Sequence, residues 1–282
     1  MATMTSVTVT ATQRRADCER IAREAARLLK SRFGDPGVVS DKGDPAVYYD
    51  VVTEVDFLSE QLVLGLIHEC APEAFVLAEE GGMTGIGGVV EEVADPSAVE
   101  ELWIVDPLDG TINFAHGIPH FAVSVACWRN GEPFAGAIAD PMVGELFSFE
   151  RTSADDQSAW HDGRRVELAD PGGAGNTLVY VGNSASRMPE LVAKFRGVRQ
   201  LASAALALAW VGVGRCGAYV QLGSLNSWDW AAGVPFIHAA GGVVSDQTGH
   251  GWPAPLIGTT GIVAAAPSVH ADVVTLLDTE AS

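Results

Sequence analysis

The sequence predicts an α+β or layered α/β fold, in which sheets are sandwiched between helices. Segments with apolar residues at helical spacing alternate with short apolar runs of strand type along the chain. No internal repeat, low-complexity tract or long linker separates two parts. The 282 residues are 48% hydrophobic, which is sufficient to fill large cores. We therefore expect a single domain over residues 1–282, with a soft division near residue 150 between an α+β half and an α/β half.

Two amphipathic helices are expected at the start of the chain. From about residue 11 to residue 33, apolar side chains recur at helical spacing among Arg and Glu, and Gly34 and Pro36 then stop the pattern. A second helical pattern runs from near Thr53 to residue 71. Thr53 and Asp56 should then lie in the first turn of the second helix.

Short apolar runs predict strands in the rest of the first half. AFVLA (74–78) and LWIV (102–105) are expected as strands, with the glycine-rich, acidic stretch 81–101 as a mobile surface loop between them. FAVSVACW, FAGAIAD and LFSFE follow, and Asn130-Gly131 is a strong hairpin signal between the first two. We expect these three segments to form an antiparallel meander.

The second half alternates strands and helices again. The expected elements are, in order, a strand at TLVYVG, a short helix over residues 189–195, an alanine-rich buried helix over 201–213, a strand at AYVQL, and a helix over 230–240 that ends at Gly241-Gly242.

Charge and composition exclude several classes of protein. The net charge of −19 would repel nucleic acid and anionic membranes, and no stretch reaches the roughly 18 apolar residues of a membrane span. The N-terminus lacks a signal-peptide pattern, so a cytoplasmic location is expected. Scattered cysteines without zinc-site spacing are expected as buried free thiols; they are Cys18, Cys70, Cys127 and Cys216.

The segment WIVDPLDGTINF (103–114) carries the most chemical information. An apolar strand there delivers Asp106 and Asp109 three residues apart, and the Leu108 carbonyl lies between them, so three hard oxygen ligands for Mg²⁺ can converge. The amides of Gly110 and Thr111 could face a phosphate if a short helix begins there. An Asp-Pro turn followed by an Asp-Gly turn is the ordinary alternative for such a segment.

Two further acidic positions favour a metal site. Glu79 and Glu80 close a strand of buried type, where an unpaired charge is costly. Asp229 lies between two tryptophans at the expected start of a helix. Taken alone, Asp229 is as readily explained as a helix N-cap.

Four motifs together resemble the inositol monophosphatase superfamily. They are DVVTEVD (50–56), AEE (78–80), WIVDPLDGT (103–111) and WDWAAG (228–233), in the family's order and approximate spacing. HGIPHFAVSVA, ADPMVGELF and the AGG segment 240–242 are similar to it as well. The resemblance covers roughly residues 42–246 and implies an αβαβα sandwich of the inositol monophosphatase and fructose bisphosphatase type.

The resemblance implies a Mg²⁺-dependent, lithium-sensitive phosphomonoesterase that acts as a homodimer. It implies two to three Mg²⁺ ions per site, with Glu79, Asp106 and the Leu108 carbonyl on the first ion and Asp106, Asp109 and Asp229 on the second. It also implies a metal-activated water oriented by Thr111 and Asp56 for in-line attack, and ionised aspartates with depressed pKa values beside the cations. The phosphate would be bound near Asp109, Gly110, Thr111 and Asp229.

The substrate implied is a small phosphorylated metabolite, first of all inositol 1-phosphate or a related polyol phosphate. The alternatives are histidinol phosphate, fructose 1,6-bisphosphate, phosphoadenosine phosphate and NADP. Gln221 stands where inositol-specific members have a glutamate, one residue farther from Asp229 than in the family. Ser203 and Asn183 align with substrate-side positions, and Lys42 with a lysine near the site.

Other interpretations stay open from the sequence alone. His116 and His120 flank a Gly-Ile-Pro loop, where substrate contact or packing is favoured over metal ligation. A haloacid-dehalogenase-like phosphatase would use an aspartate as a covalent nucleophile, but its two acids lie two residues apart. A non-catalytic relative that binds a phosphorylated ligand or serves as a scaffold is a rival of another class.

Overall fold

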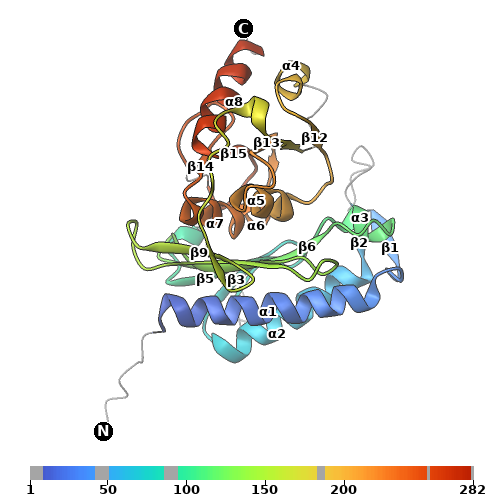
Figure 1. The fold of residues 1–282 in the computed structure, drawn as a ribbon. Coiled ribbons are helices and arrows are strands. Elements are labelled where there is room, and N and C mark those ends of the chain that lie inside the picture. Colours follow the sequence, from blue (N-terminus) through green and yellow to red (C-terminus); the bar gives the residue numbers. More distant parts are fainter. Residues whose placement is uncertain (1–8, 42–50, 86–94, 183–187, 253–254, 281–282) are drawn as a thin grey trace.

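The computed structural model describes residues 9–41, 51–85, 95–182, 188–252 and 255–280. Five layers alternate between helices and sheets (Figure 1): α1 and α2, an eight-stranded sheet, α5 to α7, a five-stranded sheet, and α4 with α8. The layered fold predicted from the sequence is confirmed. No helix of the described residues is both long and apolar enough to cross a membrane.

The first layer consists of α1 (Ala11–Arg32) and α2 (Glu54–Cys70), close to the predicted bounds. Each begins with a threonine N-cap in a capping box, Thr10 for α1 and Thr53 for α2. The apolar face of α1 is fully buried against the large sheet, as Ile21 and Leu29 show. Between the two helices, the short strands β1 (Val39–Asp41) and β2 (Val51–Thr53) pair with each other.

The eight-stranded sheet has the order β10-β9-β8-β7-β6-β5-β3-β4, and β3 and β5 are its parallel pair. The predicted antiparallel meander is confirmed. Asn130 and Gly131 form its first turn, and both have left-handed φ angles, 50° and 77°. The strands are β3 (Phe75–Ala78), β4 (Gly82–Gly85), β5 (Glu101–Asp109), β6 (Ala122–Arg129), β7 (Glu132–Ala139), β8 (Leu146–Arg151), β9 (Gln157–His161) and β10 (Arg164–Val166).

The stretch predicted as a loop between β3 and β5 is partly regular. Residues 82–85 form β4, which pairs with β3, and Pro96–Ala98 forms a 3₁₀ turn. The prediction of a loop was therefore wrong at both ends of the stretch, while residues 86–94 lie outside the described ranges. The strand escapes sequence-based prediction because GMTG has no apolar alternation and becomes a strand only by pairing with its neighbour.

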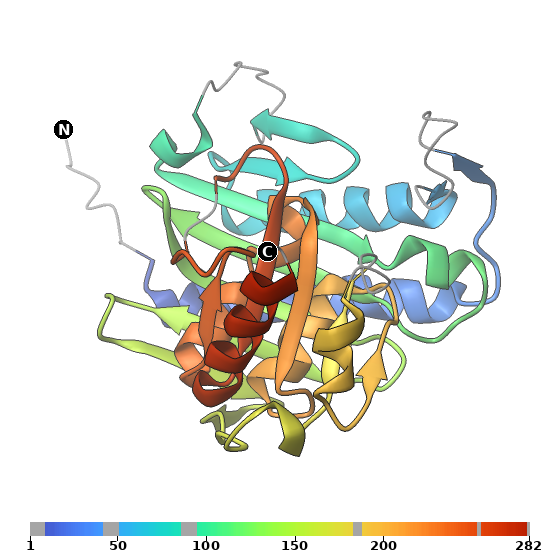
Figure 2. The ribbon, with the colours of Figure 1, turned by 90° about the horizontal axis from the view of Figure 1, so that it is seen from above.

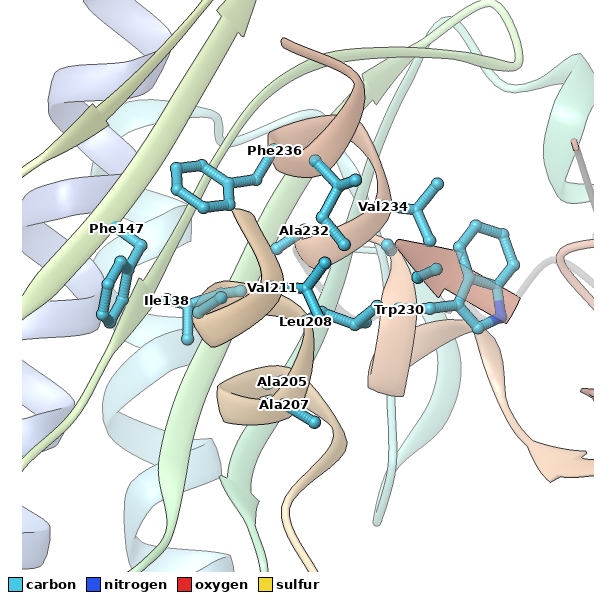
Figure 3. Close-up of a cluster of buried hydrophobic side chains, with 14 of the residues drawn as sticks. Ile138, Phe147, Ala205, Ala207, Leu208, Val211, Trp230, Ala232, Val234 and Phe236 are labelled. Atoms are coloured by element: carbon cyan, nitrogen blue, oxygen red, sulfur yellow. The ribbon is translucent and has the colours of Figure 1, made fainter. Parts of the chain in front are cut away.

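The middle layer consists of α5 (Ala204–Gly212), α6 (Ser227–Trp230) and α7 (Gly233–Ala240). The single helix predicted over residues 230–240 is divided into α6 and α7, and its predicted end at Gly241 is confirmed by a φ of 95° there. Figure 3 shows how the layer is packed: Leu208 and Phe236 from the helices and Phe147 from the large sheet belong to one buried cluster.

The five-stranded sheet has the order β12-β11-β13-β15-β14 and is mixed, because β13 is parallel to β11 and antiparallel to β15. The helix α8 (Pro267–Glu280) lies over it, as the view in Figure 2 shows, with α4 (Pro189–Ala193) beside it. The strands are β11 (Val179–Val181), β12 (Val198–Arg199), β13 (Ala218–Leu225), β14 (Val243–Ser245) and β15 (Thr260–Ala265).

All four cysteines are free thiols, and all but the half-buried Cys70 are buried.

Candidate active site

The last residues of β5 place two carboxylates on the same side of the chain. Asp106 faces Ser124 of β6 and Asp109 faces Ala122, so three steps along β5 match two along β6. In a regular strand, residues three apart point to opposite faces, and a bulge removes this difference. The Asp-Pro-x-Asp segment is thus a bulged strand end rather than a pair of ordinary turns.

Asp229 joins this pair from α6, on the far side of the site. Carboxylate oxygens of Asp106, Asp109 and Asp229 all lie within 4.8 Å of one another. Asp106 is 1% exposed and Asp109 is 6% exposed. The N-cap alternative for Asp229 is wrong: Asn226 is the N-cap of α6, and Asp229 accepts a hydrogen bond from the Asn226 amide at 2.7 Å as the third helical residue.

Burial raises the pKa of two of the acidic side chains, and neighbouring carboxylates add to this shift at Asp106. Burial raises the pKa of Asp106 well above its ordinary value of 3.8, and the nearby carboxylate of Glu79 is the next largest cause. Burial also raises the pKa of Asp109, and the hydrogen bond from Ser203 opposes this shift. The depressed pKa values predicted from the sequence refer to aspartates beside bound cations, and for that state they stay a prediction. A divalent cation would favour the ionised forms.

The start of α5 holds Asp109 in place. Ser203, the N-cap of α5, donates its hydroxyl to Oδ2 of Asp109 at 2.5 Å. The backbone amide of Ala205 donates to the same oxygen at 2.8 Å, and that of Ala204 to Oδ1 at 3.2 Å. The unpaired amides of a helix N-terminus favour a carboxylate in this way. Ser203, predicted as a substrate contact, therefore also positions a predicted metal ligand.

Thr111 begins the short helix α3 (Thr111–Ala115), as predicted, and Gly110 before it has a φ of 99° that only glycine adopts readily. The hydroxyl of Thr111 donates to Oδ1 of Asp56 at 2.8 Å, so the two residues named from the sequence are in direct contact. It also lies 3.1 Å from the carbonyl oxygen of Leu108. The other oxygen of Asp56 accepts the backbone amide of Thr53 at 2.8 Å.

One buried polar face of α2 organises three segments of the site. Asp56 contacts α3, Ser59 donates to the Pro107 carbonyl oxygen at 2.8 Å, and Glu60 accepts the amide of Glu80 at 3.1 Å. The spacing of Asp56, Ser59 and Glu60 places them on one helical face. Sequence reasoning found only Asp56, although buried polar residues at this spacing are the signal for the other two.

A pocket of about 250 Å³ lies where these segments meet the second sheet. Two tyrosines, Tyr180 of β11 and Tyr219 of β13, lie in its wall and were missed by sequence reasoning. Burial raises the pKa of both hydroxyls, so they remain neutral donors at ordinary pH. The predicted site residues that line the pocket are Glu79, Asp106, Leu108, Asp109, Gly110, Thr111, Ser203, Gln221 and Asp229.

The two histidines have different surroundings. His120 is buried, its Nε2 lies 3.1 Å from the Tyr180 hydroxyl, and burial lowers its pKa to about 4. His116 is exposed, with Nδ1 2.8 Å from a carbonyl oxygen of α3. Neither belongs to a group of side chains that could hold a metal within the described residues. Lys42 and Asn183, also named from the sequence, lie outside these residues.

The donor set suits a hard divalent cation. The converging groups are carboxylate and carbonyl oxygens without a cysteine or histidine, which is the preference of Mg²⁺ rather than Zn²⁺. No lysine or arginine among the described residues lines the pocket to neutralise these acids. Two buried carboxylates as close as Asp106 and Asp109 are stabilised by a cation, which a bound divalent ion would supply.

Comparison with known proteins shows the family of the chain. Residues 10–280 match the inositol monophosphatase family. The chain is 35% identical over 241 residues to an inositol-1-monophosphatase of Mesorhizobium japonicum, covering 81% of this chain and 83% of that protein. It is 34% identical over 242 residues to the Nus factor SuhB of Pseudomonas aeruginosa, covering 82% and 84%. An inositol monophosphatase structure from Thermotoga maritima superposes with a TM-score of 0.80 at 28% identity, covering 93% and 95%. The chain belongs to the inositol monophosphatase family.

Proposed function

We propose that this protein is a Mg²⁺-dependent phosphomonoesterase that hydrolyses a small phosphorylated metabolite by in-line attack of water on phosphorus. The observation that carries the proposal is the convergence of Asp106, Asp109 and Asp229 within 4.8 Å at one pocket. Thr111 lines the same pocket, and its hydroxyl is hydrogen-bonded to Asp56 behind it. The family membership supports a phosphatase. The likeness to SuhB leaves a non-catalytic role as the rival hypothesis.

Five groups would hold the metal. Glu79, Asp106 and the Leu108 carbonyl would form one set of ligands, and Asp109 and Asp229 would complete a second set that shares Asp106. Bound Mg²⁺ neutralises the phosphate oxygens and the leaving alkoxide and lowers the pKa of water.

Thr111 and Asp56 would orient the attacking water. The Thr111 hydroxyl already donates its proton to Asp56, so its oxygen lone pair is free to accept a proton of the water and fix its direction. Asp56 is 1% exposed and has both oxygens hydrogen-bonded, which limits its movement. The pair acts by position rather than by forming a covalent intermediate.

Inositol 1-phosphate or a related polyol phosphate is the first candidate substrate. The name of the Mesorhizobium relative supports it. Histidinol phosphate, fructose 1,6-bisphosphate, phosphoadenosine phosphate and NADP are the alternatives. A single domain, a homodimer, a cytoplasmic location and inhibition by Li⁺ remain predictions that accompany this proposal.

The test is phosphate release from this panel of esters in Mg²⁺ and in EDTA, with Asp106→Asn as the paired variant. We expect release that requires Mg²⁺ and falls by at least about 100-fold in the variant, because the shared ligand is lost. Full activity of Asp106→Asn would refute the ligand assignment. A lack of release from every ester would favour the non-catalytic rival.

A further inference from the structure

The side chain of Gln221 offers the pocket an amide nitrogen that has no hydrogen-bond partner among the described residues. It is 8% exposed and lies in the pocket wall on β13. Within the described parts of the chain, its Oε1 has a hydrogen-bond partner and its Nε2 has none. Nε2 is not one of the fully buried side-chain atoms that lack a partner, so it is accessible from the pocket, where a ligand atom that accepts its hydrogen bond would replace water.

Two neighbours enclose the oxygen end of this amide. The hydroxyl of Tyr219, which is 1% exposed, donates to Oε1 of Gln221 at 3.0 Å. Gly182 approaches the same oxygen so closely that a Cβ there would lie 1.6 Å from it. Oε1 is therefore enclosed between a phenol and a backbone, and Nε2 with its two protons remains for the pocket.

The same wall bends sharply just after Gln221. The pairing of β13 with β15 changes register between Gln221 and Leu225, and Gly223 and Ser224 have φ angles of 82° and 68°. A left-handed serine is strained, and such strain persists where the surroundings enforce it. The result is that the exposed Ser224 lines the pocket and adds a second neutral hydrogen-bond donor.

We propose that the alcohol half of the substrate carries an anionic oxygen acceptor, a carboxylate or a second phosphate, which Nε2 of Gln221 binds with Ser224 beside it. This inference rests on the phosphatase function proposed above. A glutamate at this position would accept hydrogen bonds and select substrate hydroxyls, whereas a fixed amide donor selects acceptors. An anionic acceptor gains the most, because a charged partner strengthens the hydrogen bond.

The test uses pairs of esters that differ in one group. Glucose 1-phosphate and glucuronic acid 1-phosphate differ by a hydroxymethyl against a carboxylate, and glycerol 3-phosphate and 3-phosphoglycerate present the same change at shorter reach. The quantity measured is the ratio of kcat/KM for the carboxylate over the hydroxyl ester. We compare this ratio between wild type and Gln221→Met, because methionine removes the amide donor at similar size without adding a charge that would itself repel a carboxylate.

We expect the ratio to fall by about tenfold or more in Gln221→Met for at least one pair, the size of a charged hydrogen bond. Tyr219→Phe should lower the ratio less, because without the Tyr219 hydroxyl the amide can rotate and present either its nitrogen or its oxygen to the pocket. If all four esters are hydrolysed but the ratios in wild type and Gln221→Met are equal for both pairs, the inference is overturned. A lack of hydrolysis of all four by a folded wild type would overturn it together with the phosphatase function.

Discussion

The hydroxyl of Thr111 donates a hydrogen bond to Asp56 at 2.8 Å, although 55 residues separate them. Asp56 is at the same time the third residue of α2, where its other oxygen accepts the amide of the N-cap, Thr53. One carboxylate thus both starts a helix and fixes a hydroxyl in the pocket. The stability of α2 and the direction of Thr111 are therefore coupled through Asp56.

Removing the Thr111 hydroxyl should reduce kcat and leave the affinity for Mg²⁺ nearly unchanged. We expect Thr111→Ala to lower kcat by about 100-fold or more, the size of a well-placed group that handles a proton. Thr111→Ser keeps the hydroxyl and should recover most of the rate. Steady-state phosphate release and calorimetric titration with Mg²⁺ measure the two effects. A comparable loss of rate in Thr111→Ser would contradict the role given to the hydroxyl.

Removing the hydroxyl of Thr53, the N-cap of α2, should lower the stability of the protein and have little effect on kcat. Thr53→Ala loses a helix cap, so its free energy of unfolding should fall by about 1 kcal/mol. The variant also loses the hydrogen bond that the Thr53 hydroxyl donates to Asp56 at 2.5 Å. Asp56 keeps its hydrogen bonds to Thr111 and to the amide of residue 53, so kcat should fall much less than in Thr111→Ala. Urea denaturation and the same phosphate assay give both numbers. A larger kcat loss in Thr53→Ala than in Thr111→Ala would show that the pair acts only through helix stability.

Magnesium should stabilise the folded chain through Asp106. At a free Mg²⁺ concentration 100 times its Kd, binding adds about 2.7 kcal/mol to the free energy of unfolding. We expect the Tm of the wild type to rise with added Mg²⁺ and the Tm of Asp106→Asn to change little. An equal rise in both proteins would mean that the ion stabilises the chain elsewhere.

Without metal, the same carboxylate should make stability fall as pH rises. The pKa of Asp106 in the folded protein is raised well above 3.8, mainly by burial, so the folded state holds this proton longer than the unfolded state. Its contribution is then fully present below pH 3.8 and is lost as pH rises through the raised value. In EDTA, wild type should lose more stability than Asp106→Asn between acid and neutral pH. Parallel pH profiles of the two proteins would disprove this.

The metal ligands could be predicted because they sit in short segments with their own signals. Asp106 and Asp109 follow a strongly apolar strand, and this pattern is local. Tyr219 and Gln221 also share one face of β13 by simple alternation, so their contact could have been found. Tyr180 could not, because only the parallel pairing of β11 with β13 brings it beside Tyr219.

Two features of the fold show where local reasoning ends. The break between α6 and α7 falls at Ala231 and Ala232, residues that favour a continuous helix, so tertiary packing decides it. By contrast, α8 went unassigned although Pro267 begins it and Val269, Val273 and Leu277 repeat at helical spacing. The local sequence therefore does not predict the break between α6 and α7, whereas the apolar spacing of residues 267–280 does predict α8.

The hydroxyl of Ser203 should raise the affinity for metal without touching the ion. It donates to Asp109, and groups that orient a metal ligand commonly change affinity by about 10- to 100-fold. We expect Ser203→Ala to weaken Mg²⁺ binding by about tenfold in a calorimetric titration. Ser227→Ala is the matched control, because the Ser227 hydroxyl is buried and has no hydrogen-bond partner in the described structure. Equal effects of the two substitutions would remove Ser203 from this role.

Gly110 and Ala202 should respond in opposite ways to an exchange between glycine and alanine. Both have positive φ, 99° and 48°, and a Cβ on Gly110 would lie 3.1 Å from the Ala202 carbonyl oxygen. Gly110→Ala adds backbone strain of about 1–3 kcal/mol and crowds that carbonyl, so the free energy of unfolding should fall by at least that amount. Ala202→Gly removes a left-handed strain of about 1–2 kcal/mol, offset by about 0.4–1 kcal/mol from the freer unfolded chain. Its free energy of unfolding should therefore stay equal or rise slightly in urea denaturation. A loss above 1 kcal/mol in Ala202→Gly would show that the methyl group of Ala202 contributes packing that outweighs its backbone strain.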